Sequence, residues 1–576
     1  MALRIVLAQI NVTVGDLKAN RDKVVSRIEE ARRLRADIVV FPEMCLTGYP
    51  PEDLLLKPDF IEAAQQALRD IAPAARGLTA IVGAACADSD LHNAAAVLHD
   101  GQIAGFYYKH YLPNYGVFDE DRYFEAGRQR LVFVREGVTI GVSICEDIWY
   151  PDGPPEAQAL CGGAELLINI SASPYTMGRG QARERMLRTR AADCTAVVAY
   201  CNLVGGQDEL VFDGHSLICG PQGELIARGR QFEEDLVVAD VEVRQVFRWR
   251  LYDPRRRKAV REDDAPFERV ALPPLEQTGA RASLQPEIAP LLQPVAEVYQ
   301  ALALATRDYV HKNGFQKVTL GLSGGVDSAL TAAIAADALG PENVVGVAMP
   351  TRYSSSHSLE DARRVADNFG FRLLTIGIDD TFQAFLDMLA PAFEGASPDV
   401  TEENLQPRIR GTLLMALSNK FGWLVLTTGN KSEIGVGYST LYGDTAGGFA
   451  VIKDVPKMLV YELSRYRNEV AGCDMIPQRV LDKAPSAELR PNQKDSVSLP
   501  AYPVLDPILH AYVEDSCGPA EIAARGSEPA TVHRVIHMVD RNEYKRRQSP
   551  PGVKITPRAF GKDWRLPITN RYRAGE

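Results

Sequence analysis

A glycine-rich turn between an apolar strand and an alanine-rich helix is the segment of this chain best suited to bind a phosphate. The run Leu320-Gly-Leu-Ser-Gly-Gly-Val-Asp-Ser-Ala329 overlaps a predicted strand, Val318–Leu322, and leads into a predicted helix, Ala329–Leu339. Backbone amides at such a turn point toward an anion at the helix N-terminus. No lysine follows the glycines, so the Walker-type phosphate loop is excluded. The alternative is a glycine turn that opens an ordinary helix.

Three further reactive residues each follow a strand-like apolar run in the first half of the chain: Glu43, Lys109 and Cys145. Together these residue types can hydrolyse an amide. The thiolate attacks the carbonyl carbon, the carboxylate takes and returns the proton, and the cation stabilises the developing oxyanion. Taken singly, a cysteine in an apolar run is usually just buried, and a lysine or glutamate is usually solvated.

The elements around these residues predict two α/β domains. A chain of 576 residues exceeds what one hydrophobic core usually supports. A proline-rich stretch over 253–290 interrupts the regular pattern, so we place the boundary there, with domains over 1–270 and 286–576. In the first domain, strand-like runs such as Thr139–Ile144 alternate with helical stretches such as Lys18–Arg35.

The second domain predicts a doubly wound parallel sheet. Strand-like runs spaced by helical segments lie at 318–322, 343–349, 372–378 and 423–428. In such a sheet the glycine turn lies at the carboxyl end of a strand, which is where ligands bind.

Composition and charge restrict the class of protein. Apolar residues make up 46% of the chain and charged residues 24%, as in a globular enzyme. A formal charge of -11 argues against nucleic-acid binding. No apolar run approaches membrane-spanning length, and the start is an apolar strand rather than a signal peptide. With nine scattered cysteines and no CxxC pair, we expect a cytoplasmic protein without a membrane partner.

The sequence around each of the three residues of the first domain is similar to a signature segment of the nitrilase, or carbon–nitrogen hydrolase, family. The segments are Phe41-Pro-Glu-Met44, Tyr108-Lys-His-Tyr-Leu-Pro113 and Ile144-Cys-Glu-Asp-Ile-Trp149. The resemblance covers about residues 2–250 and implies an αββα sandwich. It also implies that Glu43 is the general base, Lys109 the electrostatic support and Cys145 the nucleophile.

Further residues of the first domain match the same family. Glu120 matches a family glutamate near the catalytic three, the alternative being a surface acid in a loop. Similarity to the glutaminase branch implies that Tyr115, Ser173 and Arg179 hold glutamine, with Arg179 suited to its α-carboxylate through a bidentate contact.

The glycine turn resembles the SGGxDS loop of the ATP pyrophosphatases. Together with the segments 403–411, 426–433, 437–444, 454–457, 485–489 and 544–548 it is similar to the NAD synthetase family over roughly residues 290–570. Members adenylate the carboxylate of deamido-NAD with ATP, and ammonia then displaces AMP. The resemblance implies that Asp327 and Glu433 hold Mg²⁺, which usually combines one or two carboxylates with phosphate oxygens and water.

The same resemblance implies two groups of binding residues. ATP would be bound by Gly321, Leu322, Ser323, Gly324, Gly325, Val326, Asp327, Ser328 and Thr428, and deamido-NAD by Asn404, Glu433, Tyr438, Ser439, Thr440, Leu441 and Lys545. Arg410, Asp444 and Lys457 are further candidates for the dinucleotide. For Arg410 and Lys457 the alternative is a solvated helix face, and Lys545 could belong to a solvated turn.

The order of the two domains resembles that of the glutamine-dependent NAD synthetases. Ammonia is mostly protonated near neutral pH and then has no lone pair for attack, so an internal supply from glutamine is useful. The resemblance implies deamido-NAD, ATP and glutamine as substrates and a homo-oligomer built on a synthetase-domain dimer. Two alternatives are an enzyme acting on another adenylated acceptor, and a nucleotide-sensing module that regulates an amidase and binds ATP without turnover.

Overall fold

The computed structural model describes residues 2–253, 258, 266–275, 281–486, 488–490, 499–572 and 574. The chain forms two compact units. Unit 1 comprises Met1–Gln207 and Val211–Leu292, and unit 2 comprises Asp208–Leu210 and Gln293–Glu576. Among the described helices, none is long and apolar enough to cross a membrane.

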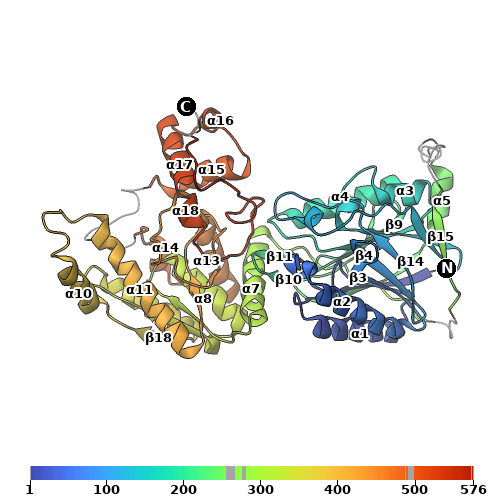
Figure 1. The fold of residues 1–576 in the computed structure, drawn as a ribbon, viewed down its shortest axis with the longest axis horizontal. Coiled ribbons are helices and arrows are strands. Elements are labelled where there is room, and N and C mark those ends of the chain that lie inside the picture. The colour runs from blue at the N-terminus through green and yellow to red at the C-terminus, as the bar shows by residue number, and fades with distance from the viewer. Residues whose placement is uncertain are drawn as a thin grey trace. The chain divides into compact units, whose positions relative to one another are not determined.

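Unit 1 is built from two β-sheets packed face to face, with helices on the two outer sides (Figure 1). The first sheet has the order β14-β1-β2-β3-β4-β5 and the second β13-β12-β9-β8-β7-β6-β15. The strands of the first sheet are β1 (Ala2–Gln9), β2 (Ile38–Val40), β3 (Thr79–Ala87), β4 (Leu91–His99), β5 (Gln102–Tyr108) and β14 (Asp235–Glu242). The strands of the second are β6 (Leu131–Arg135), β7 (Val138–Ile144), β8 (Leu166–Ser171), β9 (Val197–Asn202), β12 (Leu217–Cys219), β13 (Leu225–Arg228) and β15 (Glu268–Leu272).

The outer layers are helical. Beside the first sheet lie α1 (Leu17–Arg33) and α2 (Pro58–Ile71), and beside the second α3 (Pro154–Leu160) and α4 (Arg179–Cys194) (Figure 1). Two further elements lie in this part of the chain. They are the helix α5 (Arg244–Tyr252) and the hairpin of β10 (Val204–Gln207) and β11 (Leu210–Asp213). The αββα sandwich predicted from the family resemblance is confirmed.

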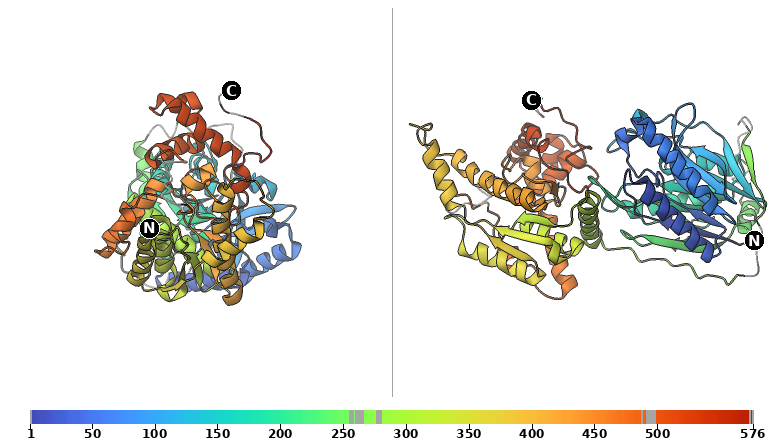
Figure 2. Two further views of the ribbon diagram at one scale, coloured as in Figure 1. Left: turned by 90° about the vertical axis from the view of Figure 1, so that its left-hand side faces the viewer. Right: turned by 60° about the horizontal axis from the view of Figure 1, so that its bottom comes forward.

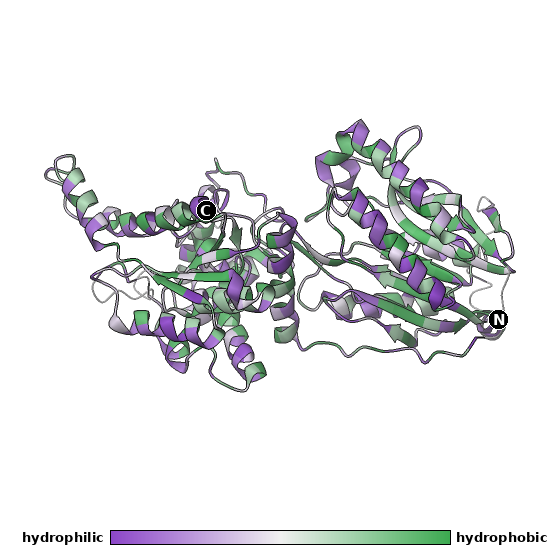
Figure 3. Cartoon of the chain, turned by 90° about the horizontal axis from the view of Figure 1, so that it is seen from below, coloured by the Kyte–Doolittle hydropathy of each residue, from purple (hydrophilic) through white to green (hydrophobic). Residues whose placement is uncertain are grey.

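The core of unit 1 follows from the alternation of side chains along each strand. In β1, every second residue from Leu3 to Leu7 faces the other sheet, and in β7 every second residue from Val138 to Ile144 does the same. Alternate residues such as Leu167 and Val198 face the helices instead. Both faces of these strands are buried, so hydrophobic residues predominate on both faces (Figure 3), with a few buried polar residues such as Arg4 and Ser143 between them.

The proline-rich stretch over 253–290, which belongs to unit 1, contains a strand that the sequence did not predict. Residues Glu268–Leu272 form β15, which pairs in parallel with β6 in the register Glu268↔Leu131. Its run of two charged residues and three small or apolar ones is short and flanked by prolines, so it lacks a clear strand pattern. The edge of the second sheet is therefore closed by this late segment of unit 1.

Unit 2 contains the predicted doubly wound parallel sheet, which is confirmed. The strand order is β18-β17-β16-β19-β20, and all neighbours are parallel. The strands are β16 (Val318–Gly321), β17 (Val344–Ala348), β18 (Arg372–Thr375), β19 (Leu424–Thr427) and β20 (Phe449–Ala450). The chain proceeds outward from β16 to β18 and then returns to the other side of β16, so the topological switch point lies between β16 and β19.

Helices surround this sheet. They are α7 (Pro294–Lys312), α8 (Val326–Leu339), α9 (Ser356–Phe369), α10 (Asp379–Leu389), α11 (Val400–Phe421), α12 (Lys431–Val436), α13 (Lys457–Ala471) and α14 (Gln478–Asp482). The helix α8 packs against β16 and β17 and contacts α7 and α13, whereas the long helix α11 packs against β16 and β19 (Figure 2).

The last part of the chain adds a helical cluster with its own core. It contains α15 (Tyr502–Leu509), α16 (Pro519–Ala524), α17 (Pro529–Arg541) and α18 (Glu543–Arg546), red in Figure 1. Leu505, Ile508 and Val539 are buried in this cluster together with Val436 from the end of α12. The cluster thereby fixes α12 and places the short helix α18, which carries Lys545.

We expect Gly83→Ala to destabilise unit 1 by about 1–3 kcal/mol, as overpacking of a tight site does. Gly83 lies in β3 against the turn that carries Glu43. A Cβ atom there would lie 2.3 Å from the carbonyl oxygen of Pro42 and 2.4 Å from the amide nitrogen of Met44. Denaturant unfolding measures the effect, with Gly377→Ala as control because its Cβ meets nothing within 4 Å. Equal stability of the two variants would contradict this packing argument.

Candidate active sites

Glu43, Lys109 and Cys145 meet inside unit 1 although they come from two different sheets. Glu43 and Lys109 follow β2 and β5 of the first sheet, and Cys145 follows β7 of the second. The Nζ of Lys109 is 2.8 Å from the Oε1 of Glu43. The three residues are 0%, 1% and 4% exposed, respectively. The facing of the two sheets is thus what brings these residues together.

The charges of this cluster act on the thiol. Burial raises the pKa of Cys145 well above its ordinary value, and the carboxylate of Glu43 raises it further, while Lys109 opposes both. Burial lowers the pKa of Lys109, but Glu120 and Glu43 outweigh that effect and keep it well above its ordinary value. The resting site therefore holds a neutral thiol beside a charged ammonium and needs a base to activate the sulfur.

Glu120 is part of the same cluster. Its Oε1 accepts hydrogen bonds at 2.8 Å from the Nζ of Lys109 and at 2.8 Å from the hydroxyl of Tyr49. The residue is 4% exposed, so its interpretation as a surface acid is wrong. Burial raises the pKa of Glu120 to about 7, with Glu43 adding to the shift and Lys109 opposing it. One buried ammonium is therefore shared by two carboxylates.

Two groups that the sequence did not identify hold Glu43 in place. The side-chain amide of Asn93, in β4, donates to the Oε1 of Glu43 at 2.7 Å. The backbone amide of Ala172, just after β8, donates to its Oε2 at 2.8 Å. The available signal for Asn93 was a lone amide side chain next to the apolar run Ala94–Leu98.

Cys145 adopts a strained backbone conformation where β7 ends. Its φ is +42°, in the left-handed region that a non-glycine residue rarely adopts. A short 3₁₀ turn, Cys145–Ile148, begins at this residue. Such strain costs on the order of 1–3 kcal/mol and persists only where the surroundings enforce it, which is typical of functional residues.

The three residues expected to bind glutamine lie around this cluster. Tyr115 is 55% exposed, and its hydroxyl donates to the Oε1 of Glu146 at 2.9 Å. Burial raises the pKa of Tyr115, the charges of Glu146 and Cys145 add to this, and Arg179 opposes it, so these groups share one electrostatic neighbourhood. Ser173 is buried and follows directly on Ala172, which contacts Glu43.

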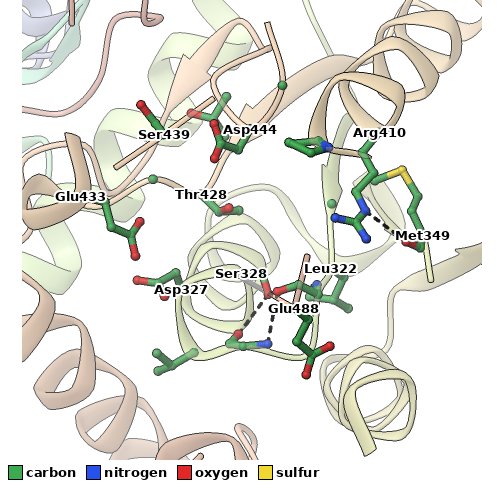
Figure 4. A pocket seen from close by; sticks show the side chains of 18 of the residues that line it. Leu322, Asp327, Ser328, Met349, Arg410, Thr428, Glu433, Ser439, Asp444 and Glu488 are labelled. Carbon is green, nitrogen blue, oxygen red and sulfur yellow. Dashed lines mark hydrogen bonds between the residues drawn. The ribbon is translucent and has the colours of Figure 1, made fainter. Parts of the chain in front are cut away.

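Unit 2 contains a cavity of about 330 Å³ at the carboxyl ends of β16 and β19 (Figure 4). It is lined by most of the residues assigned from sequence: Gly321, Leu322, Ser323, Gly325, Val326, Asp327, Ser328, Thr428, Glu433, Tyr438 and Ser439, with Arg410, Asp444 and Lys457. The glycine turn therefore opens into a ligand-sized space at the topological switch point. Its interpretation as a plain helix start explains none of this lining.

Glycine is required at one position of this turn. Gly324 has a φ of +77°, and a Cβ there would lie 2.2 Å from the carbonyl oxygen of Ser358. The hydroxyls of Ser323 and Ser328 are 3.1 Å apart, and the amide of Gly325 donates to the Oγ of Ser323 at 3.3 Å. The turn thus presents hydroxyls and backbone amides at the start of α8.

Asp327 and Glu433 are brought together by one ammonium group. The Nζ of Lys457 contacts the Oδ2 of Asp327 and lies 3.4 Å from the Oε1 of Glu433. Asn430 donates to the Oδ1 of Asp327 at 2.8 Å and accepts from the amide of Glu433 at 3.0 Å. Lys457 is 2% exposed, so the alternative of a solvated helix face is wrong for this residue.

The two carboxylates suit Mg²⁺ only if phosphate oxygens complete its coordination. Within the described ranges, no group of three or more His, Cys, Asp or Glu residues could hold a metal by itself. Mg²⁺ usually takes one or two carboxylates together with substrate phosphates and water. Asp327 and Glu433 line the same cavity as the glycine turn, so the donor set fits this type of site.

Five assigned residues lie outside the wall of the cavity: Gly324 of the glycine turn, and Asn404, Thr440, Leu441 and Lys545. The Oγ1 of Thr440 donates to the Oδ1 of Asn404 at 2.7 Å, and Leu441 follows Thr440 in the chain. The Nζ of Lys545 donates to the backbone carbonyl of Ser439 at 2.8 Å. This contact excludes a freely solvated turn for Lys545, which holds the segment that carries Ser439.

Lys483 and Glu488 also line the cavity, and neither was given a role of its own from sequence. The Nζ of Lys483 is 2.8 Å from the Oε1 of Glu488 and 2.7 Å from the Oγ of Ser358. Arg410 also faces the cavity, where its Nε donates to the carbonyl of Met349 at 3.1 Å (Figure 4). No sequence spacing relates Lys483 to Ser358, because α9 and the segment after α14 meet only in the folded unit.

Known proteins match both units. Family models describe a carbon–nitrogen hydrolase over residues 4–251 and an NAD synthase over 298–549. The chain is 49% identical over 573 residues to a glutamine-dependent NAD(+) synthetase of Thermotoga maritima, with 99% of each chain covered. It is 48% identical over 574 residues to that of Aquifex aeolicus, covering 99% of this chain and 100% of the relative. A solved glutamine-dependent NAD+ synthetase of Acinetobacter baumannii, in complex with ADP, is 41% identical with a TM-score of 0.75 and full coverage of both chains.

Fold, sites and matches define an enzyme in which a carbon–nitrogen hydrolase domain and an NAD synthase domain share one chain. The alternative of a nucleotide-sensing module without turnover does not fit this class. The similarity extends over the full length at 42–49% identity. The chain belongs to the family of glutamine-dependent NAD+ synthetases.

Proposed function

We propose that this chain amidates deamido-NAD to NAD+ with ATP, using ammonia that unit 1 releases from glutamine. The products are AMP, pyrophosphate and glutamate. The observation that carries this proposal is the pairing of a buried cysteine, lysine and glutamate in unit 1 with a cavity over a glycine turn and a carboxylate pair in unit 2. Unit 1 supplies the ammonia that the reaction in unit 2 requires.

In unit 1, Cys145 attacks the side-chain amide of glutamine. Glu43 accepts the thiol proton as the carbon–sulfur bond forms, and the charge of Lys109 stabilises the oxyanion. Glu43 then returns the proton to the departing nitrogen, which leaves as ammonia. Water attacks the thioester with Glu43 as base, glutamate leaves, and the sulfur regains its proton.

Glutamine is recognised at the mouth of this buried cluster. Arg179 begins α4, and its guanidinium lies 4.2 Å from the ring centroid of Trp149, which restricts its orientation. A guanidinium can bind the α-carboxylate of an amino acid through two hydrogen bonds. Tyr115 and Ser173 would contact the remaining polar groups of the substrate.

In unit 2, the glycine turn and the hydroxyls of Ser323 and Ser328 bind the ATP phosphates, and Thr428 contacts the nucleotide. Asp327 and Glu433 would hold Mg²⁺, which, when bound, supplies positive charge to the departing pyrophosphate. The carboxylate of deamido-NAD attacks the α-phosphorus, and ammonia then displaces AMP. Residues around Tyr438 and Ser439, with Asn404 and Lys545 behind them, orient the dinucleotide.

The setting of the reaction follows from the same chemistry. We expect the ammonia to travel inside the protein, since ammonium formed in solution has no lone pair with which to attack. We also expect a cytoplasmic homo-oligomer built on a synthetase-domain dimer, as the family resemblance implies.

Cys145→Ala should abolish glutamine-supported NAD+ formation, by about 10³-fold or more, as loss of a nucleophile does. Activity with high ammonium should stay close to wild type because only the ammonia source depends on the thiol. Both rates are measured as NAD+ formed, with Cys473→Ala as control since this cysteine is exposed. Equal loss of both activities in a folded variant would count against the assignment.

Asp327→Asn and Glu433→Gln should each abolish NAD+ formation from either nitrogen source. The reason is that both carboxylates are assigned to the cation on the departing pyrophosphate. Pyrophosphate release is the measurement, and glutamate release reports whether unit 1 is still active. Asp367→Asn, an exposed change on α9, is the matched control. Wild-type pyrophosphate release in either variant would reject this role.

The acceptor can be tested without a nitrogen source. With ATP and deamido-NAD the enzyme should release pyrophosphate, and free nicotinate should support little release because remote contacts orient the acceptor. Lys545→Ala should impair deamido-NAD use more than ATP binding, whereas the exposed control Lys420→Ala should not. If another carboxylate drove release better than deamido-NAD, the enzyme would act on a different adenylated acceptor.

A further inference from the structure

Asp147 joins the segment after Lys109 to the rest of the thiol site. Its carboxylate is completely buried, and its Oδ1 accepts hydrogen bonds from the backbone amides of His110 at 3.1 Å and Tyr111 at 3.0 Å. These are the two residues that follow Lys109 in the chain. One carboxylate oxygen thus holds the backbone that carries the ammonium.

The second oxygen of the same carboxylate holds the backbone beside the nucleophile. The Oδ2 of Asp147 accepts from the amide of Ile144 at 3.0 Å and from the hydroxyl of Tyr107 at 2.9 Å. Ile144 directly precedes Cys145, so the hydrogen bond from its amide to Asp147 closes a short loop around Cys145, the residue with the strained φ. Strain of this kind needs such support from its surroundings.

These bonds join the end of β5 in the first sheet to the end of β7 in the second. Other polar contacts also cross between the sheets, such as the pair of Arg135 in β6 with Asp37 beside β2. The bonds to Asp147 differ in position, because they hold the backbone next to Lys109 and next to Cys145. Hydrogen bonds are short and directional, so one buried carboxylate fixes these two segments relative to each other.

The four groups that donate hydrogen bonds to Asp147 are all uncharged, so this buried carboxylate depends on hydrogen bonds rather than on a direct ion pair. Burial raises the pKa of this carboxyl to about 6, and the amides of Ile144 and Tyr111 oppose the shift. A buried anion without a cation as direct partner is tolerated because several N–H and O–H groups solvate it. The arrangement suits a group whose task is to fix backbone geometry.

We propose that Asp147 is a positioning residue for amide hydrolysis, which sets the ammonium of Lys109 relative to the sulfur of Cys145. The inference rests on the proposed roles of those two residues. It predicts that Asp147 affects the rate of the chemical step and leaves glutamine binding largely unchanged, because a misplacement of about 1 Å costs on the order of 10²-fold in rate.

Asp147→Asn is the main test, since its amide nitrogen cannot accept the bonds that one carboxylate oxygen now accepts. We expect the kcat of glutamate release to fall about 10²-fold, with KM for glutamine within about threefold and ammonium-supported NAD+ formation unchanged. Labelling of Cys145 by an electrophilic glutamine analogue should slow in parallel. A merely structural role would lower stability without this split between kcat and KM.

Tyr107→Phe is the matched control, because it removes the one hydrogen bond to Asp147 that a side chain donates and leaves the three bonds from backbone amides. Its kcat should stay within about threefold of wild type, because the backbone contacts that place Lys109 and Cys145 remain. Asp147→Glu keeps the charge but displaces it by one methylene, and it should lose kcat as Asp147→Asn does.

The outcomes separate this inference from the proposed function. If glutamate release persists in Cys145→Ala, the proposed function of unit 1 fails. If it is lost there but a folded Asp147 variant keeps kcat within about threefold of wild type, only the positioning role falls. If neither Asp147 variant folds, the residue is structural and the inference is overturned.

Discussion

A buried ammonium shared by two carboxylates holds each candidate site together. In unit 1 it is Lys109 between Glu43 and Glu120, and in unit 2 it is Lys457 between Asp327 and Glu433. Removing one partner of such a group typically destabilises a protein by about 3–5 kcal/mol, because a charge then stays buried without compensation. Both sites therefore depend on keeping one ammonium and two carboxyl groups together, and neighbouring elements must enforce that geometry.

The ends of the β-strands hold these charged side chains in position. The glycine turn and α12 follow β16 and β19, which are neighbours in the sheet, so Asp327 and Glu433 start from adjacent positions at the switch point. In unit 1 the reactive residues come from facing sheets instead, and hydrogen bonds donated by Asn93 and accepted by Asp147 must complete the alignment. A single parallel sheet positions its site through topology, whereas a sandwich needs additional polar links.

This difference explains how far the sequence could predict the sites. Residues at or just after the ends of apolar strands, such as Cys145 and the glycine turn that leads to Asp327, were predictable because strand ends are readable and the family motifs include them. Asn93 and Lys483 were not, because their roles arise from packing between distant segments, and a lone amide beside an apolar run, as at Asn93, does not by itself indicate a site. The strand β15 was missed for a local reason: its short, half-charged run lies among prolines.

Both ammonium groups are buried, but the carboxylates around them differ in exposure, and this difference suits the two chemistries. In unit 1 the side chains of Lys109 and Glu43 have no exposed surface, so the charges are held in place while Glu43 exchanges a proton with the reacting groups. In unit 2 the carboxylates of Asp327 and Glu433 remain 18% and 20% exposed toward the cavity. There a ligand that brings its own phosphates and cation can redistribute the contacts of Lys457, because the phosphates offer the ammonium new partners as the carboxylates take the metal. A closed charge cluster thus serves proton transfer, and an open one serves the exchange of a charged leaving group.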